Sequence, residues 1–510
     1  MTVCKPEQAD GYLSPSDLIF LEVYRLIELV LKNGKLVTSS GIFDGGIGIE
    51  DGVIRTIAKD ANLPAAGKVI DLKGKLVLPG AIDIHTHPGG KHPLGDDFRT
   101  ETPGALLGGV TTMGGIVRVP RMGQPFKEET GPADVVSWFD VFELGKNVAE
   151  QNSSTDFFFI FTLNSMQHAE EIPEYVQKLG VCGFKYHGNL KNIANHPMGP
   201  KWAGRMAFPV SYDDRLAFRA MEQISRTSKG VLLVHCENTE ISKIFAERVK
   251  ATGRTDPAAW SEALPGFLEA DHVRRYTYLA KVTGSRMHIV HLTSREGLDQ
   301  LIAAKKEGVR VTAEACPQYL MVDPAKAGFL GKLNPPLRPE ADREALWGGV
   351  TNGWIDSIGT DHVVSNKYEK LEWGDGSVGG DPASNIWFTG SGSTGIQTML
   401  ITMFWEGFRR RGLSLERLVE LISTNPAKIA GLFPKKGTLN EGSDADLTVI
   451  DQNKEGRITS DWLKSYGDFT LFENMQGEGW PWMTVLRGKI VALDDELQVG
   501  PGYGRFVKSA

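Results

Sequence analysis

The sequence predicts an α/β protein: a (β/α)8 TIM barrel with a small β-sandwich domain built from both ends of the chain. Between about residues 76 and 360, short apolar runs of strand-like composition alternate with helical stretches eight times, as parallel strands with crossover helices do. Before and after this region, β-like runs are separated by turn signals such as Asn33-Gly34 and Asp51-Gly52. The economical arrangement packs the two ends together as one domain beside the barrel.

We expect the small β-domain to take residues 17–77, the metal-dependent catalytic barrel residues 78–432, and the rest of the β-domain with a tail residues 433–510. The N-terminal β-like runs indicate a small antiparallel sheet. The first barrel strand is expected from residue 76 to a pair of histidines, and the others at 111–119, 157–163, 181–185, 231–235, 287–291, 309–313 and 357–360.

The expected helices are placed by their end signals. A helix over 98–109 would have Thr102 as N-cap and Pro103 as its first helical residue. Others are expected at 298–307, stopped by Gly308, and at 415–423.

Composition limits the classes of function. The 510 residues carry a net charge of −7, which argues against a general nucleic-acid binder, and 41% of them are hydrophobic, as in ordinary globular proteins. Four scattered cysteines form no CxxC pair and no disulfide framework. The apolar stretch at 18–31 contains Glu22, Arg25 and Glu28, too many charges for a membrane span, and no secretory signal precedes it. We expect a cytoplasmic enzyme without a membrane partner.

The stretch from Gly80 to His87 is central to the prediction. It is a β-branched segment that ends in two histidines separated by one residue. Alternate side chains of a strand share a face, so His85 and His87 should point the same way and could chelate one metal ion. The alternative is a pair of structural histidines at a strand end, so the interpretation depends on further ligands.

Further metal-competent side chains end later strand-like segments. They are Lys185, His235, His291 and Asp361. With the two histidines they make six candidates, all at the C-terminal ends of predicted barrel strands, where barrel enzymes carry their chemistry. The set therefore predicts a metal site at that face of the barrel.

Several motifs in order resemble the amidohydrolase superfamily, specifically its cyclic-amide hydrolases: hydantoinases, dihydropyrimidinases, allantoinases and dihydroorotases. The resemblance covers nearly the whole chain. Its motifs are Leu78-Pro79-Gly80, Asp96-Asp97-Phe98, Gly183-Phe184-Lys185, His235-Cys236-Glu237-Asn238, Glu314-Ala315-Cys316-Pro317, Asn334-Pro335-Pro336-Leu337-Arg338, Gly359-Thr360-Asp361-His362 and Gly442-Ser443-Asp444-Ala445-Asp446.

The resemblance implies two divalent metal ions per subunit, with Zn²⁺ as the expected metal. His85, His87 and Asp361 would hold the more buried ion, and His235 and His291 the other. Lys185 would be N6-carboxylysine, its CO₂-derived carbamate bridging both ions. A carbamate forms only from the neutral amine, which nearby cations help to populate.

The implied reaction is opening of a cyclic amide or imide ring, of hydantoin or dihydropyrimidine type, by a metal-bridging hydroxide. Asp361 would take the proton of the water and return it to the leaving nitrogen. The implied partners are a small cyclic amide and further copies of the chain, as a tetramer or a dimer, with no nucleic acid.

The sequence departs from the family at the residue that donates to the oxyanion. Hydantoinases and dihydropyrimidinases have a tyrosine five residues beyond the carboxylated lysine, where this chain has Leu190. If the strand continues, His187 shares the face of Lys185 while Tyr186 points away. We therefore expect His187 to be the replacement donor, with Tyr186 as the second choice.

Two further positions concern the substrate. Asn334 matches a family position that contacts the substrate ring, and His362 would orient either Asp361 or the substrate. The arginine with which dihydroorotases clamp a substrate carboxylate is replaced by Gly89, which counts against dihydroorotate.

Long loops at 188–211 and 363–390 are expected to be lids or pocket walls at the catalytic face. Their aromatic residues, Trp202, Trp373 and Trp387, suggest a planar or substituted ring as substrate, or serve only for packing.

Three alternatives stay open at this point. The first is an allantoinase or a hydrolase of another lactam or imide. A mononuclear deaminase fits less well because that branch lacks the strand-four lysine. A non-catalytic scaffold related to dihydropyrimidinase would have lost metal ligands, whereas all six positions are present here.

Overall fold

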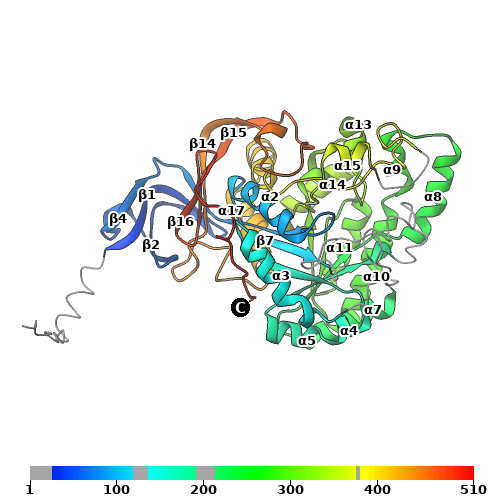
Figure 1. Cartoon of the computed structure of the whole chain (residues 1–510), viewed down its shortest axis with the longest axis horizontal. Coiled ribbons are helices and arrows are strands. Elements are labelled where there is room, and N and C mark those ends of the chain that lie inside the picture. The colour runs from blue at the N-terminus through cyan, green and yellow to red at the C-terminus, as the bar shows by residue number, and fades with distance from the viewer. Residues whose placement is uncertain (1–25, 119–135, 191–212, 375–379, 510) are drawn as a thin grey trace, which may run out of the picture.

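Two sheets organise the protein. The computed structural model describes residues 26–118, 136–190, 213–374 and 380–509. In this part of the chain, eight strands form one sheet in sequential order and nine strands form another. Figure 1 shows the smaller β-domain, with blue and orange-red strands side by side, next to the helix-covered barrel.

The eight-stranded sheet is the predicted barrel. Its strands are β6 (Ala81–Thr86), β7 (Val110–Val117), β8 (Asp156–Thr162), β9 (Gly183–His187), β10 (Val231–His235), β11 (Met287–Ile289), β12 (Val311–Ala315) and β13 (Ser357–Ile358). Neighbours pair in parallel, and a parallel bridge between Thr86 and His362 joins the first strand to the segment after the last. The prediction of a (β/α)8 barrel is confirmed.

Helices cover the outside of the barrel (Figure 1). The α-helices are α2 (Leu94–Leu107), α3 (Trp138–Asn152), α4 (Met166–Glu170), α5 (Ile172–Glu174), α7 (Asp214–Ser225), α8 (Thr239–Ala251), α9 (Pro257–Ala263), α10 (Phe267–Thr283), α11 (Arg295–Lys306), α12 (Pro317–Met321), α13 (Pro324–Ala327), α14 (Glu340–Thr351), α15 (Lys367–Leu371), α16 (Met399–Thr402), α17 (Leu415–Val419) and α18 (Asn425–Ile429). The 3-10 helices are η1 (Asp60–Asn62), η3 (Gly188–Leu190), η5 (Gly328–Gly331) and η8 (Ser460–Trp462), and the π-helical segments are η2 (Tyr175–Leu179), η6 (Met403–Arg410) and η7 (Glu420–Thr424).

The start of α2 differs from the prediction. Pro103 lies inside the helix, and the Thr102 hydroxyl donates to the carbonyl of Phe98 instead of capping a helix start. A proline inside a helix removes one backbone donor. Here the N-terminal turns also bury Leu94 and Phe98, and this apolar burial favours the longer helix.

Both chain ends contribute to the second sheet, as predicted. Its strands are β1 (Ile27–Thr38), β2 (Gly41–Glu50), β3 (Val53–Ala58), β4 (Ala66–Asp71), β5 (Leu76–Pro79), β14 (Leu447–Arg457), β15 (Gln476–Leu486), β16 (Lys489–Leu493) and β17 (Glu496–Leu497). The ends meet where β5 pairs antiparallel with β14. The sheet is mixed rather than antiparallel, because β1 runs parallel to both β4 and β5.

The first barrel strand is shorter than expected because the chain changes sheets at Gly80. β5 belongs to the small sheet, and β6 begins the barrel one residue later. A Cβ at Gly80 would lie 2.2 Å from the Thr111 hydroxyl oxygen, so only glycine fits at this crossing. The domain limits at residues 77 and 432 stay a prediction.

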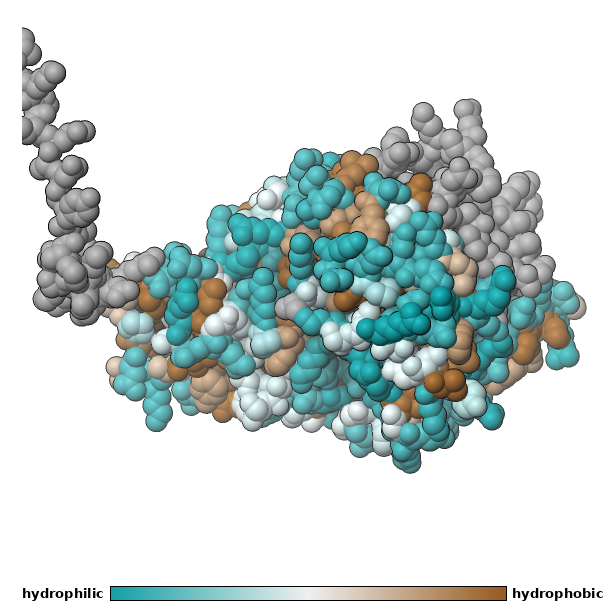
Figure 2. All heavy atoms as spheres, turned by 90° about the horizontal axis from the view of Figure 1, so that it is seen from below, coloured by the Kyte–Doolittle hydropathy of each residue, from teal (hydrophilic) through white to brown (hydrophobic). Residues whose placement is uncertain are grey.

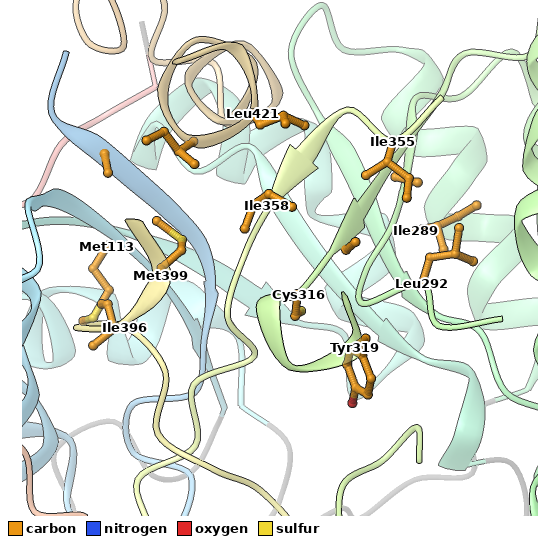
Figure 3. Close-up of a cluster of buried hydrophobic side chains, with 14 of the residues drawn as sticks. Met113, Ile289, Leu292, Cys316, Tyr319, Ile355, Ile358, Ile396, Met399 and Leu421 are labelled. Atoms are coloured by element: carbon orange, nitrogen blue, oxygen red, sulfur yellow. The ribbon is translucent and has the colours of Figure 1, made fainter. Parts of the chain in front are cut away.

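The main core lies between the barrel strands and the helices around them. Figure 3 shows part of it, with Ile289 from β11, Cys316 just after β12 and Ile358 from β13 converging. The face seen in Figure 2 is largely hydrophilic, with hydrophobic side chains in small groups. Among the described residues, no helix combines the length and apolarity needed to cross a bilayer.

Candidate metal centre and substrate pocket

The six predicted ligands gather at one end of the barrel. His85 lies in β6 and His87 just beyond it, Lys185 lies in β9, and His235 ends β10. His291 and Asp361 follow β11 and β13 within three residues. Five of the six line one pocket, with His85 buried next to them. The C-terminal ends of parallel barrel strands thus bring together residues up to 276 positions apart.

The nitrogen and oxygen donors converge in two groups. Asp361 Oδ1 lies 2.9 Å from His87 Nε2 and 3.2 Å from His85 Nε2. His235 Nδ1 and His291 Nε2 lie 2.9 Å apart. The Lys185 Nζ lies 3.5 Å from His85 Nε2 of the first group, and Lys185 lines the same pocket as His235 and His291. Such convergence of imidazole and carboxylate atoms fits a divalent metal.

Protonation states also fit metal binding, since a ligand imidazole must be neutral. Burial lowers the pKa of His85 to about 4 and that of His235 to about 3. It likewise holds the pKa values of His87 and His291 well below the ordinary value. Burial lowers the pKa of Lys185 to about 8, against the opposing charges of Asp361 and Glu314, so a fraction of its amine is neutral near pH 7.

Glu314, at the end of β12, positions two of these histidines. Its Oε1 lies 2.7 Å from His85 Nδ1 and accepts the backbone N–H of His291 at 3.0 Å. Burial alone would raise the pKa of Glu314, but His85 and His288 outweigh it and leave the pKa below its usual value. An ionised carboxylate on Nδ1 fixes the tautomer in which Nε2 faces the metal site.

Two ligand residues have unusual backbone conformations. His291 has φ 37° and Asp361 has φ 51°, in the left-handed region that residues with a Cβ seldom adopt. Such conformations persist where the surrounding structure enforces them, and they concentrate at functional sites. The barrel holds both side chains in place against a local backbone cost.

The pocket beside the ligands contains two of the predicted substrate-site residues. Its described lining comprises His87, Gly90, Lys91, Arg118, Lys185, His187, Asn189, His235, His291, Asn334, Asp361, Val363, Ser391 and Gly392. His187 and Asn334 are therefore placed where a substrate would meet them. Leu190 belongs to η3, next to the pocket residue Asn189.

The other two predicted substrate-site residues point elsewhere. The Tyr186 hydroxyl donates to the carbonyl of Asp213 and packs against Tyr276, outside the pocket lining. His362 Nε2 lies 3.1 Å from Glu101 Oε2, and its Nδ1 accepts the backbone N–H of Gly395. These contacts place the Tyr186 hydroxyl outside the pocket lining and tie His362, the neighbour of Asp361, to Glu101 and to the backbone of Gly395.

The described tryptophans of the long loops do not line the pocket. Trp387 packs against Trp260, and its indole N–H donates to the carbonyl of Arg254. Trp373 is 52% exposed. Trp387 is therefore a packing residue. Trp202 and most of the 188–211 loop lie outside the described residues.

Sequence reasoning missed four residues at this site: Glu314, Lys91, Arg118 and Asn189. Glu314 stands in a recognised motif, but its role needs the distance to His85. Arg118 directly follows a strand-like apolar run, as Lys185 ends one, and this signal could have found it.

A second carboxylate group is not a metal site. Asp156, Asp444 and Asp446 lie close together at the junction of the two sheets. The buried amine of Lys436 stands between them, with Nζ 2.9, 3.1 and 2.5 Å from their respective carboxylates. This cluster is an internal ion-pair network that joins the domains.

Comparison with known proteins agrees with this geometry. Residues 205–491 match the amidohydrolase family. The chain is 31% identical to the L-hydantoinase of Paenarthrobacter aurescens, over 94% of this chain and 98% of that protein. It is 30% identical to the D-hydantoinase of Geobacillus stearothermophilus and to an allantoinase of Bacillus licheniformis, again over 94% of this chain, and over 96% and 99% of those proteins.

Solved structures give the same result. The L-hydantoinase (dihydropyrimidinase) from Arthrobacter aurescens superposes with a TM-score of 0.81 at 29% identity, covering 95% of this chain and 100% of that one. A D-hydantoinase structure matches with the same TM-score at 28% identity, covering 94% and 98%. With the barrel, the ordered motifs and the converging ligand set, these matches show that the chain belongs to the amidohydrolase family.

Proposed function

We propose that this protein is a metal-dependent cyclic amidohydrolase that opens a ring amide or imide of the hydantoin or dihydropyrimidine type. The observation that carries the proposal is the convergence of His85, His87, Lys185, His235, His291 and Asp361 at one pocket. The whole-length similarity to hydantoinases and to an allantoinase supports the substrate class.

The ligand set suits two divalent ions, with zinc as the first choice and with Lys185 carboxylated. His85, His87 and Asp361 would hold one ion, and His235 and His291 the other, with the Lys185 carbamate between them. When bound, such a pair supplies an activated water near neutral pH and polarises the amide carbonyl.

The side chains themselves handle protons and position the ring. Asp361 is set at the pocket, where it can hold the proton of the attacking water and deliver it to the leaving ring nitrogen. His362 and Glu101 keep the segment after β13 in place by their contact with each other and with the backbone at Gly395.

His187 is our candidate for the polar group that steadies the developing oxyanion. It lies on the same pocket as Lys185 and is 5% exposed. Replacing it, His187→Ala, should lower kcat by about 10²- to 10³-fold while the metal content is unchanged. Full turnover by this variant with its metal retained would contradict the role.

The proposals for assembly and cellular location rest on the similarity of the chain to the cyclic-amide hydrolases. We propose that the chain forms a homo-oligomer, a tetramer or a dimer, in the cytosol. Three described cysteines, Cys182, Cys236 and Cys316, are free and buried, as expected in a reducing compartment.

The function is tested by incubating metal-loaded protein with hydantoin, dihydrouracil, allantoin or a simple cyclic imide. Ring opening is measured as the loss of ring absorbance. We expect opening of at least one ring, and loss of at least 10³-fold in the Asp361→Asn variant. If the metal-loaded protein opens none of these rings, the proposed substrate class is wrong. Preference for allantoin would select the allantoinase alternative.

A further inference from the structure

The chemistry of the pocket wall indicates the kind of ring it receives. Among the described lining residues, only Val363 has an aliphatic side chain, and none is phenylalanine, tyrosine or tryptophan. Two cationic side chains, Arg118 and Lys91, lie on this wall in addition to the ligand residue Lys185. Two cationic side chains beside the candidate metal ligands favour a ring substituent that carries a negative charge.

Arg118 is placed to meet a ligand. It directly follows β7 and is only 8% exposed, so its side chain is held within the structure. Its Nη1 lies 3.9 Å from the point that a Cβ on Gly90 would occupy. Because residue 90 has no side chain, the guanidinium borders the pocket next to His87. A guanidinium stays charged at every pH that the fold tolerates.

Lys91 adds a second cation on the same wall. Its amine donates to the Ser365 hydroxyl at 2.9 Å and to the carbonyl of Ser391 at 3.3 Å. Both acceptors are neutral, the charges of Glu369 and Asp97 also act on this amine, and an ammonium has a third N–H. Ser391 also lines the pocket, so these contacts fix the Lys91 amine at its edge.

We propose that the ring substrate carries a carboxylate, which Arg118 binds and Lys91 supports while the scissile amide faces the metal ligands. The inference rests on the proposed function and specifies its substrate class. A planar guanidinium matches a carboxylate with two parallel N–H···O bonds, which fixes orientation as well as adding affinity. A carboxylate held in this way would orient the ring with respect to Lys185 and His291.

The test compares two substrates that differ only in charge: hydantoin-5-acetate and hydantoin-5-acetamide. For the metal-loaded wild type, we expect kcat/KM to favour the acid by about 10- to 100-fold, mainly through KM. In Arg118→Gln the preference should fall to about 3-fold or less, because only the acid loses its guanidinium partner. Arg118→Lys keeps the charge but not the fork and should retain part of the preference.

A matched control removes one positive charge far from the pocket. Lys281→Gln, on the exposed face of α10, should leave the preference for the acid intact. The melting temperature of Arg118→Gln and its remaining turnover of the amide show whether the variant is still folded. A folded variant that loses the preference for the acid has lost only the contact with the carboxylate. Equal or faster opening of the amide by the wild type, or an unchanged preference in Arg118→Gln, would overturn the inference while the proposed function stands.

Binding distinguishes this inference from the proposed reaction. If neither these rings nor the four rings of the functional test are opened, calorimetric binding of hydantoin-5-acetate to the wild type but not to Arg118→Gln would support the carboxylate site and refute the reaction. Absence of acid-specific binding in both proteins would overturn the carboxylate site.

Discussion

His291 and Asp361 carry out their roles from a backbone conformation that costs free energy. Both have positive φ, and both follow short parallel strands whose next residues must turn away from the barrel axis. A left-handed conformation costs a residue with a Cβ about 1–2 kcal/mol. The fold therefore gives up some stability to direct two candidate ligand side chains into one pocket.

This cost predicts an unusual order of stability. In metal-stripped protein, His291→Gly should be more stable than His291→Ala by about 0.5–1 kcal/mol, because glycine adopts positive φ without strain. The free energy of unfolding in urea measures the difference. At His87, which is not a positive-φ residue, the order should reverse. An alanine variant that is the more stable one at position 291 would contradict the strain.

Glu314 acts at the same scale, through His85. Glu314→Gln keeps the shape of the side chain but removes the charge that fixes the imidazole tautomer. We expect metal affinity to fall by about 10- to 100-fold, as measured by competition with a chelator, while the melting temperature of the stripped protein changes little. Unchanged affinity would mean that Glu314 only packs beside the site.

At the scale of elements, His92 ties the loop after β6 to two helices. Its Nδ1 lies 3.1 Å from Asp97 of α2, and its Nε2 lies 2.6 Å from Glu369 of α15. Burial would lower the pKa of His92, but the hydrogen bonds and charges of these two carboxylates outweigh it and raise the pKa to about 9. The protonated imidazole thus links segments that flank the pocket.

The sign of this shift fixes a dependence of stability on pH. A pKa raised from the ordinary 6.5 to about 9 gives stabilisation that is complete below pH 6.5 and is lost as the pH rises through 9. Allowing for partial solvent exposure, His92→Gln should cost about 1–2 kcal/mol at pH 6 and much less at pH 9.5. Urea unfolding at both values measures it. An equal cost at both would show that the ion pairs contribute nothing.

Strand ends were predictable from the sequence, as was the start of α17 at Leu415, whereas the start of α2 and the direction of the β-domain strands were not. Apolar runs such as 231–235 gave the positions of β8, β10 and their neighbours to within about two residues. The start of α2 was missed because tertiary burial outweighed the local signal of Pro103. The parallel pairing of β1 with β4 and β5 depends on long-range contacts that turn signals do not encode.

Within the site, the gathering of the six candidate ligands was predictable because each lies at the end of a strand-like run, and the barrel brings all such ends to one face. Most of the pocket wall was not, because Arg118, Lys91 and Ser391 come together only through the folding of three separate segments. The orientation of His362 toward Glu101 likewise depends on α2, whose start the sequence misplaced.

At the scale of the whole molecule, Lys436 joins the two sheets. Its amine is 1% exposed and contacts Asp156 at the start of β8 and Asp446 just before β14. Arg487, after β15, also pairs with Asp156 and donates its backbone N–H to Asp446. The junction between the barrel and the β-domain therefore contains buried charges that depend on one lysine.

Removing that lysine should destabilise the whole protein. Lys436→Met leaves three carboxylates without their shared cation and should cost about 3–5 kcal/mol, or prevent folding. Lys454→Met, which removes a partly exposed partner of Asp495, should cost about 1 kcal/mol or less. The melting temperatures of the two variants compare them, and equal shifts would contradict the importance of the junction.

The most direct test of the account is the metal content of the purified protein, measured by elemental analysis on the wild type and on Lys185→Ala. We predict about two divalent ions per chain for the wild type after reconstitution with zinc and bicarbonate, and fewer for Lys185→Ala. A wild type that binds no metal under these conditions would contradict the central claim that the six gathered side chains form a metal centre.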